Sequence, residues 1–170
     1  METIKPRFNY TQGAWQGSNY EKTRDMTTSE LTKAIRNGLK EMFAGCTFSV
    51  TKQDYSGGRS IDVVLMSATF KVFATPSLEV AESNRRHNYT AEEIMAMWQD
   101  AITKGHHGLN PHNISEDFYL TDKAREVLTR ALGFVQSFNF DDSDSQSDYF
   151  HTNFYLHPSI GRWSKPFVQK

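Results

Sequence analysis

TTSELTKAIRNGLKEMFAGCTFSVTKQDYSGGRSIDVVLM, residues 27–66, is the stretch of sequence that best predicts the fold. Its first half opens with Thr27 and Glu30, the residue types of an N-terminal capping box, and ends at Gly45. Between these points, apolar residues recur at the spacing of one helix face: Leu31, Ala34, Ile35, Leu39, Met42 and Phe43. The pattern predicts an α-helix near residues 28–43.

The second half of the stretch predicts a β-hairpin. Apolar and polar residues alternate over 46–51, turn-forming residues fill 54–58, and 60–66 is again mainly apolar. Residues 70–74 suggest a third strand, and the polar connection over 76–89 leaves room for a short helix. This part of the chain is therefore expected to supply antiparallel strands.

Two further helices and one further strand follow. Thr90 and Glu93 form a second capping box, which opens a helix near 91–104. Another helix is predicted near 122–137 from its apolar periodicity. The most regular alternation in the chain predicts a strand over 149–157.

Together these elements predict the fold class and the domain organisation. We expect a single α+β domain over residues 27–170, with a small antiparallel sheet packed against about three helices. Residues 1–26 are rich in aromatic and polar side chains without a period, which is typical of an N-terminal arm that packs its rings on the domain. The length of 170 residues suits one domain with its own core.

Composition and charge exclude several classes of protein. The net charge of -1 argues against a domain that binds nucleic acid mainly through electrostatics. Cys46 is the only cysteine, which excludes intramolecular disulfides and cysteine-rich zinc sites. No apolar run has the length of a transmembrane helix, and the first residues do not resemble a secretory signal. A cytoplasmic location is expected.

Charge is unevenly distributed along the chain. Residues 1–75 carry ten Lys and Arg against seven Asp and Glu, a net +3, whereas residues 76–170 carry nine against thirteen, a net -4. The helix near 28–43 presents a basic stripe of Lys33, Arg36 and Lys40, and a serine-rich loop is acidic through Asp141, Asp142 and Asp144. The basic stripe and the acidic loop are each suited to bind a partner surface of opposite charge. The alternative is that both are ordinary solvated surface.

The predicted strand over 149–157 has two distinct faces. One face combines rings that stack with groups that hydrogen-bond, and it consists of Tyr149, His151, Asn153, Tyr155 and His157. Such a surface is suited to recognising a protein or a single-stranded nucleic acid. The alternative is that a helix or the N-terminal arm covers this face.

Histidines and aspartates raise the alternative of a metal-dependent nuclease or hydrolase. Imidazole and carboxylate groups bind zinc, manganese and iron, and the candidates are His106, His107, His112, His151, Asp141, Asp142 and Asp148. The adjacent pair His106 and His107 lacks the i, i+4 spacing of a helical metal pair, so solvated loop histidines are the simpler interpretation. The acidic loop lacks the glycine and glutamate of a calcium-binding EF-hand. No metal site is therefore predicted.

Nucleophilic and phosphate-binding motifs give no stronger signal. Cys46 begins a strand directly after a helix and has no histidine nearby in the sequence, so a structural cysteine is expected. The glycines of residues 56–59 join two strands, which a hairpin turn explains without a phosphate-binding loop. We therefore predict no catalytic residues and no cofactor.

A family resemblance adds a biological setting. The segments Glu30–Phe43, Cys46–Val50 and Ser56–Val63 together resemble the large polyvalent protein associated domain of the twenty-ninth type over residues 27–66. Residues 141–166 resemble a segment that accompanies such domains. The resemblance implies a protein of a phage, plasmid or integrative element, and it brings no catalytic motif.

These observations favour a non-enzymatic binding protein of a mobile genetic element. We expect it to act by protein–protein contact on host defence or processing machinery, as an anti-CRISPR or anti-restriction factor would. The metal-dependent nuclease or hydrolase and a nucleic-acid-binding regulator stay open as alternatives. The expected contact surfaces are the face of the strand over 149–157, the acidic loop and the basic stripe.

Overall fold

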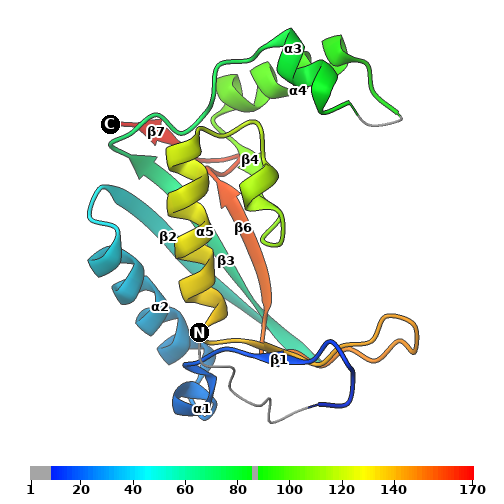
Figure 1. The fold of residues 1–170 in the computed structure, drawn as a ribbon. Helices are drawn as coiled ribbons and strands as arrows, with labels where there is room; N and C mark the ends of the chain where they lie inside the picture. The colour runs from blue at the N-terminus through cyan, green and yellow to red at the C-terminus, as the bar shows by residue number, and fades with distance from the viewer. Residues whose placement is uncertain (1–8, 86–87) are drawn as a thin grey trace.

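A computed structural model describes residues 9–85 and 88–170, and it shows a mixed β-sheet with helices packed on one face (Figure 1). The main sheet has the order β2-β3-β6-β4, with β7 paired to β3. Its strands are β2 (Cys46–Tyr55), β3 (Gly58–Ala68), β4 (His107–Gly108), β6 (Tyr155–Ile160) and β7 (Val168–Gln169). The α+β fold class predicted from the sequence is confirmed.

Two long helices form the layer that covers the sheet. They are α2 (Thr28–Met42) and α5 (Asp122–Gln136), and both lie on the same face of the sheet (Figure 1). Their apolar stripes bury fully against the central strands because each helix repeats apolar residues at helical spacing. The core includes Leu31, Ile35 and Leu39 of α2, Leu128 and Leu132 of α5, and Ile61, Val63 and Leu65 of β3.

Both predicted capping boxes are present. At the start of α2, the Thr27 hydroxyl accepts the Glu30 N–H, and the Glu30 carboxylate accepts the Thr27 N–H at 2.8 Å. Thr90 and Glu93 repeat the arrangement at α4 (Ala91–Lys104). These bonds satisfy N–H groups that a helix otherwise leaves without partners, which is why both helices begin where the sequence predicts.

The β2–β3 hairpin also follows its sequence. The two strands pair antiparallel from Cys46 with Ala68 down to Tyr55 with Gly58, so the connection is a two-residue turn. Gly57 in this turn has a φ of +94°, a value that glycine adopts without strain. The glycines of residues 56–59 are therefore explained by the turn, as expected.

Three predictions about strands are wrong. The strand predicted over 149–157 is instead β6, Tyr155–Ile160. The Asn153 side chain donates to the carbonyl of Phe138, and the Phe154 N–H donates to the Asn139 side chain. These bonds hold the residues before Tyr155 away from the main sheet. β6 runs parallel to β3, so the sheet is mixed and not antiparallel. Residues 70–74 form only the isolated bridge of Phe73 with Leu120.

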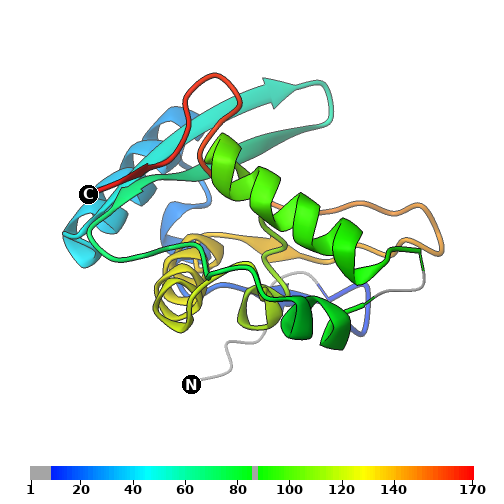
Figure 2. The same cartoon turned by 90° about the horizontal axis from the view of Figure 1, so that it is seen from above.

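A smaller group of helices packs beyond one end of the sheet. It contains α3 (Leu78–Ser83), α4 and the short 3-10 helix η1 (Ile114–Glu116), and Figure 2 shows α4 and α3 side by side at this end. Ala81, Ala91 and Ile94 form its own small apolar cluster. The short helix expected within residues 76–89 is thus confirmed as α3.

The described part of the expected N-terminal arm, residues 9–26, packs on the opposite end of the molecule. β1 (Trp15–Gln16) pairs antiparallel with β5 (Phe140–Asp141), and α1 (Tyr20–Thr23) follows. The Tyr20 ring is 7% exposed and packs edge-on against Phe140, with centroids 4.8 Å apart. Residues 1–8 of the expected arm lie outside the described residues.

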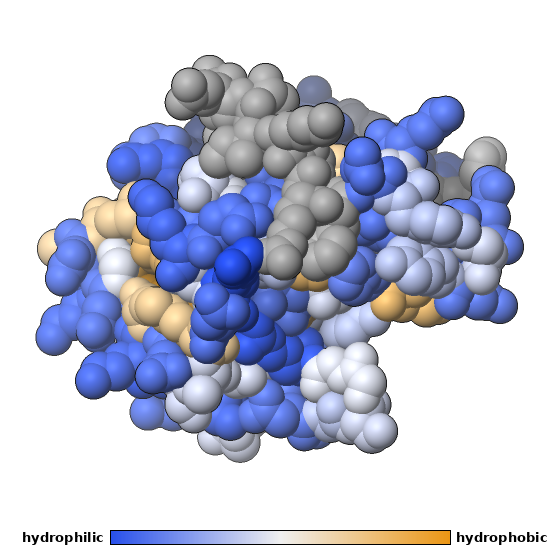
Figure 3. Space-filling view, turned by 90° about the horizontal axis from the view of Figure 1, so that it is seen from below, coloured by the Kyte–Doolittle hydropathy of each residue, from blue (hydrophilic) through white to orange (hydrophobic). Residues whose placement is uncertain are grey.

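The surface at this end is mainly polar. Seen from below, it is largely hydrophilic, with small and separated apolar patches (Figure 3).

Over residues 9–85 and 88–170, none of the helices combines the length and the hydropathy that crossing a bilayer requires.

We predict opposite effects for two glycine-to-alanine substitutions. Gly161 has a φ of +60°, and a Cβ atom there would collide with the carbonyl oxygen of Gly105. Gly161→Ala should therefore lower the free energy of unfolding by about 2–4 kcal/mol. Gly133 lies inside α5 with no described atom near its Cβ position, so Gly133→Ala should raise that free energy by about 0.5–1 kcal/mol. Urea unfolding followed by circular dichroism measures both, and equal stability of the two variants would contradict this packing.

Candidate functional site

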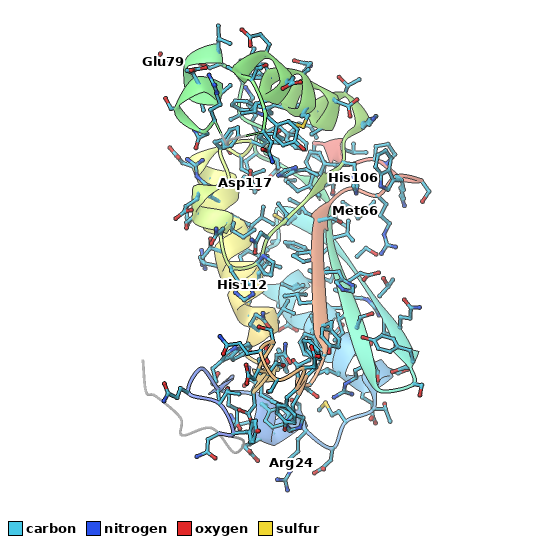
Figure 4. The ribbon with its side chains drawn as sticks, turned by 90° about the vertical axis from the view of Figure 1, so that its right-hand side faces the viewer. Arg24, Met66, Glu79, His106, His112 and Asp117 are labelled. Carbon is cyan, nitrogen blue, oxygen red and sulfur yellow. The ribbon has the colours of Figure 1, made fainter. Side chains whose placement is uncertain are left out.

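The face of the sheet turned away from α2 and α5 is the candidate binding surface. Side chains alternate along each strand, so every second residue points away from the helices. Figure 4 views the sheet from its edge, with α5 on one side and strand side chains projecting on the other. We call this the open sheet face, and it consists of Ser49, Thr51, Gln53, Tyr55, Asp62, Tyr155, His157 and Ser159, with Arg162 and Trp163 from the loop after β6. Ser60 and Val64 of β3 point to the same side but are buried by their neighbours.

A row of polar side chains crosses the open sheet face. Asp62 stands between Thr51 of β2 and His157 of β6, with Oδ2 at 3.3 Å from Thr51 Oγ1 and Oδ1 at 3.3 Å from His157 Nδ1. Arg162 extends the row, because its Nη2 donates to Ser49 Oγ and Thr51 Oγ1 at 3.1 Å. An exposed ion pair of this kind contributes at most about 1 kcal/mol to stability. The row therefore serves mainly to orient donors and acceptors toward solvent.

Three aromatic side chains stand exposed around this row. Tyr55, Tyr155 and Trp163 are 44%, 38% and 74% exposed. Tyr55 and Tyr155 lie on either side of Gly58, since a Cβ there would be 3.3 Å from Tyr55 Cε2 and 3.6 Å from Tyr155 Cε2. Burial first, and then the neighbouring Tyr155, raise the pKa of Tyr55 above its ordinary value. Trp163 is thus the most exposed ring of the set.

A hollow of about 370 Å³ lies beside Trp163 and is lined also by Asp62, His106 and His157. The His106 ring packs on Trp163 with centroids 4.8 Å apart, and Lys104 Nζ lies 5.3 Å from the Trp163 ring. These contacts hold the indole against the body while most of its surface faces solvent. The hollow therefore has one aromatic wall and one polar wall.

The five residues predicted to share one strand face are placed in three different surroundings. Tyr155 and His157 belong to the open sheet face, as described above. Tyr149 and His151 lie outside β6, in the acidic loop and just after it, with Tyr149 Oη 3.2 Å from His151 Nδ1. Asn153 faces inward, where its Nδ2 donates to Phe138 O at 2.8 Å and its Oδ1 accepts from Arg59. The prediction of a single shared face is wrong, because the strand begins only at Tyr155.

The acidic loop uses its carboxylates to fix the chain locally. Asp142 is 2% exposed and accepts the backbone N–H groups of Tyr10 and Thr11 at 2.9 and 2.8 Å. Burial raises the pKa of Asp142, but the hydrogen bonds from Thr11 and Tyr10 outweigh it and leave the pKa lowered. A hydrogen bond from Ser147, followed by one from the Gln146 backbone, lowers the pKa of Asp144.

Asp141 has a similar local role, since its Oδ1 accepts the Ser143 N–H at 2.9 Å. The acidic residues predicted as a contact surface are therefore partly occupied by internal hydrogen bonds. Asp148 is exposed and has a positive φ of 53° at the turn of the loop. Contact with a partner through this loop stays a prediction.

The basic stripe lies on a different side of the molecule from the open sheet face. Lys33, Arg36 and Lys40 are exposed on α2, which covers the opposite face of the sheet. Arg36 Nη2 also donates to the carbonyl of Val50 at 2.6 Å, so this side chain helps to cover the edge of β2. Lys33 and Lys40 thus lie on α2, on the other side of the sheet from the open sheet face, while Arg36 reaches the edge of β2.

The side chains considered for a metal site are His106, His107, His112, His151, Asp141, Asp142 and Asp148. Figure 4 shows His106 and His112 at separate places in the fold. Within the residues that the structure describes, no group of three or more His, Cys, Asp or Glu side chains is placed to hold a metal ion. Cys46 is half-buried, and burial raises the pKa of its thiol, which disfavours the reactive thiolate.

A second cavity, of about 560 Å³, lies between α4 and η1, and no pattern in the sequence marks it. At its wall His107 Nε2 lies 2.8 Å from Asp117 Oδ2, and these side chains are only 18% and 16% exposed. The interpretation of His107 as a solvated loop residue is therefore wrong. The two partners are ten positions apart in the sequence, across a segment that includes η1, and no periodic pattern marks such a pairing.

Comparison with known proteins identifies the family of the chain. The family model of large polyvalent protein associated domain 29 matches residues 26–118, more than half of the chain. The chain belongs to this family. Domain 29 here spans α2, the β2–β3 hairpin, α3, α4 and β4, which confirms the resemblance seen over residues 27–66. Residues 141–166 lie outside the match.

Membership of the domain 29 family associates the chain with mobile genetic elements. No curated protein and no solved structure matches the chain.

We predict that Asp142→Asn loosens the packing of residues 9–26 at neutral pH. The pKa of Asp142 is lowered in the folded protein, so its stabilisation is fully present above the ordinary carboxyl pKa of about 4. That stabilisation is lost as the pH falls below this value toward the folded-state pKa. The stability difference between wild type and variant should therefore shrink from about pH 4 downward.

Urea unfolding at a series of pH values, followed by tryptophan fluorescence, measures this difference. Asp148→Asn is the matched control, because Asp148 lies in the same loop and is exposed. A constant difference between wild type and Asp142→Asn down to pH 2–3, about one to two units below the ordinary carboxyl pKa, would show that the charge of Asp142 is not responsible.

Proposed function

We propose that this chain is a non-enzymatic binding protein of a mobile genetic element, which contacts a host protein in the cytoplasm through the open sheet face. The observation that carries the proposal is the exposure of Tyr55, Tyr155 and Trp163 on a sheet face that α2 and α5 leave uncovered. Exposed aromatic side chains gathered on one face are typical of interaction surfaces. Tyrosine, tryptophan and arginine are also the residues that contribute most to binding at protein interfaces.

The charge of the open sheet face favours a protein over a nucleic acid. Its charged residues are Arg162 and Asp62, which cancel, and His157 is paired with Asp62. A surface that follows a phosphate backbone needs several lysines or arginines, since binding depends on releasing counterions. Of the basic stripe, Arg36 reaches the edge of β2, whereas Lys33 and Lys40 lie on α2, on the other side of the sheet.

Within this proposal, the surface and the family together lead us to suggest a counter-defence role. The domain 29 family associates the chain with mobile elements, and such elements benefit from proteins that block host restriction or CRISPR enzymes. Host enzymes of this kind hold nucleic acid in basic grooves. Residues 76–170 carry a net charge of -4, and their acidic residues, which all lie outside the open sheet face, suit contact with such a groove beside it. We therefore place the proposed partner among host defence or processing proteins.

One observation favours a nucleic-acid-binding regulator as the second candidate. Tyr55 and Tyr155 flank Gly58 on an uncovered sheet, and adjacent rings on a sheet are able to stack unpaired bases. Base stacking of this kind is possible on a protein surface with little net charge. The affinity for the nucleic acid would still fall strongly as the salt concentration rises. The experiment below separates the two candidates.

We predict that Tyr155→Ala and Trp163→Ala each reduce capture of the same host protein by about tenfold or more, as interface aromatics commonly do. The tagged full-length chain is used to isolate partners from nuclease-treated extract of the native host, and the captured protein is then titrated in purified form. Phe150→Ala is the matched control, because Phe150 is 61% exposed but lies in the loop outside β6.

Equal capture by wild type and both face variants would refute the proposed surface. Titration with single-stranded DNA and RNA at low and high salt completes the test. Saturable binding that weakens steeply with salt and is lost in Tyr155→Ala would replace the protein partner by a nucleic acid.

A further inference from the structure

The cavity of about 560 Å³ beside α4 has a wall that is fixed without a ligand. Asp117 Oδ2 lies 2.8 Å from His107 Nε2, and Asp117 Oδ1 accepts the backbone N–H of Tyr119 at 3.1 Å. The Tyr119 ring stacks on His107 and on Trp98, with centroids 4.8 and 5.4 Å apart. The volume lies in the range of small-molecule sites, and a preformed wall of this kind lowers the entropic cost of binding.

The other lining groups offer a carboxylate and apolar surface. The side chains of Glu116, Asn113 and Tyr89 make no hydrogen bond to another described residue, and all three are exposed. Tyr89 is 50% exposed and Met97 is 40% exposed, so an aromatic ring and a thioether border the cavity. An occupant would thus meet both an unused charged acceptor and apolar surface.

Charge identifies the class of occupant. The charged carboxylates among the described lining residues are Glu116 and Asp117, and no described lysine or arginine lines the cavity. Residues 76–119, which include every described lining residue, contain seven Asp and Glu against three Lys and Arg, a net -4. A phosphate or carboxylate ligand would be repelled there, whereas a cation is attracted. Aromatic walls add to the binding of an organic cation in particular.

We propose that this cavity binds an organic cation, a guanidinium or ammonium group on an aliphatic stem. Glu116 accepts hydrogen bonds from the charged head, and the Asp117 carboxylate lies behind it in the fixed wall. The stem packs along Tyr89 and Met97. This proposal does not depend on the open sheet face, because Asp62, Tyr155 and Trp163 do not line the cavity.

Two sources share this chemistry, a free polyamine and an arginine or lysine side chain on a peptide. The full-length chain is titrated by calorimetry with agmatine, with spermidine and with acetyl-Gly-Arg-Gly-amide. The matched neutral ligand is the same peptide with citrulline in place of arginine. We expect saturable one-to-one binding of the cations and none of the citrulline peptide. Tighter binding of the peptide identifies a protein side chain as the source, and tighter binding of the amines identifies a free ligand.

Charge-neutral variants locate the binding site. Glu116→Gln should weaken cation binding by about tenfold, the usual effect of removing a charged hydrogen-bond partner. Asp117→Asn should weaken it as well, but Asp117 also holds His107, so the exposed Glu116 is the decisive position. Glu79→Gln is the matched control, since Glu79 is an exposed carboxylate on α3 outside the lining (Figure 4).

Three outcomes would overturn the proposal. The first is the lack of saturable binding for every cation tested. The second is equal binding of the arginine and citrulline peptides, which would show that charge is not recognised. The third is an equal loss of affinity in Glu79→Gln and Glu116→Gln, which would show a diffuse attraction to the acidic region in place of a site.

Discussion

The parallel pairing of β3 with β6 is the constraint on which the rest of the structure depends. A parallel neighbour cannot be reached through a short turn, so the chain must cross over between the two strands. Here the crossover is residues 69–154, and it carries α3, α4 and α5. It places α5 on the core face and brings His157 beside Asp62. The same crossover builds the cavity between α4 and η1, so both candidate sites are products of this one connection.

The sequence predicted those elements whose causes are local. The capping boxes at Thr27 and Thr90, the apolar spacing of the long helices and the turn at Gly57 each act within a few residues, and the structure contains all of them. The start of β6 was misplaced because its cause is distant. Asn139, which lies three residues after α5, hydrogen-bonds the backbone of Phe154, so the alternating residues before Tyr155 do not form a strand. A hydrogen bond between residues so far apart in the sequence cannot be predicted from a local pattern.

The candidate site was predictable only in part for the same reason. The pattern of their own strand identifies Tyr155 and His157, but Asp62, the partner of His157, comes from β3, far away in the sequence. Asn153 shows the opposite error, because a polar residue beside aromatic ones resembles a binding residue. Its side chain instead bonds Arg59, whose pKa is lowered by burial and which joins the hairpin to the segment before β6. Residue composition alone therefore does not distinguish a binding residue from one that stabilises the fold.

The limits of the family match distinguish the two candidate sites further. Residues 26–118 include the hairpin side of the open sheet face and nearly all of the lining of the cavity, which ends at Tyr119. Tyr155, His157, Arg162 and Trp163 lie beyond the match. The domain therefore carries almost a complete cavity, whereas the open sheet face is completed by residues that follow it. On this basis the cavity is a property to seek in other members of the family.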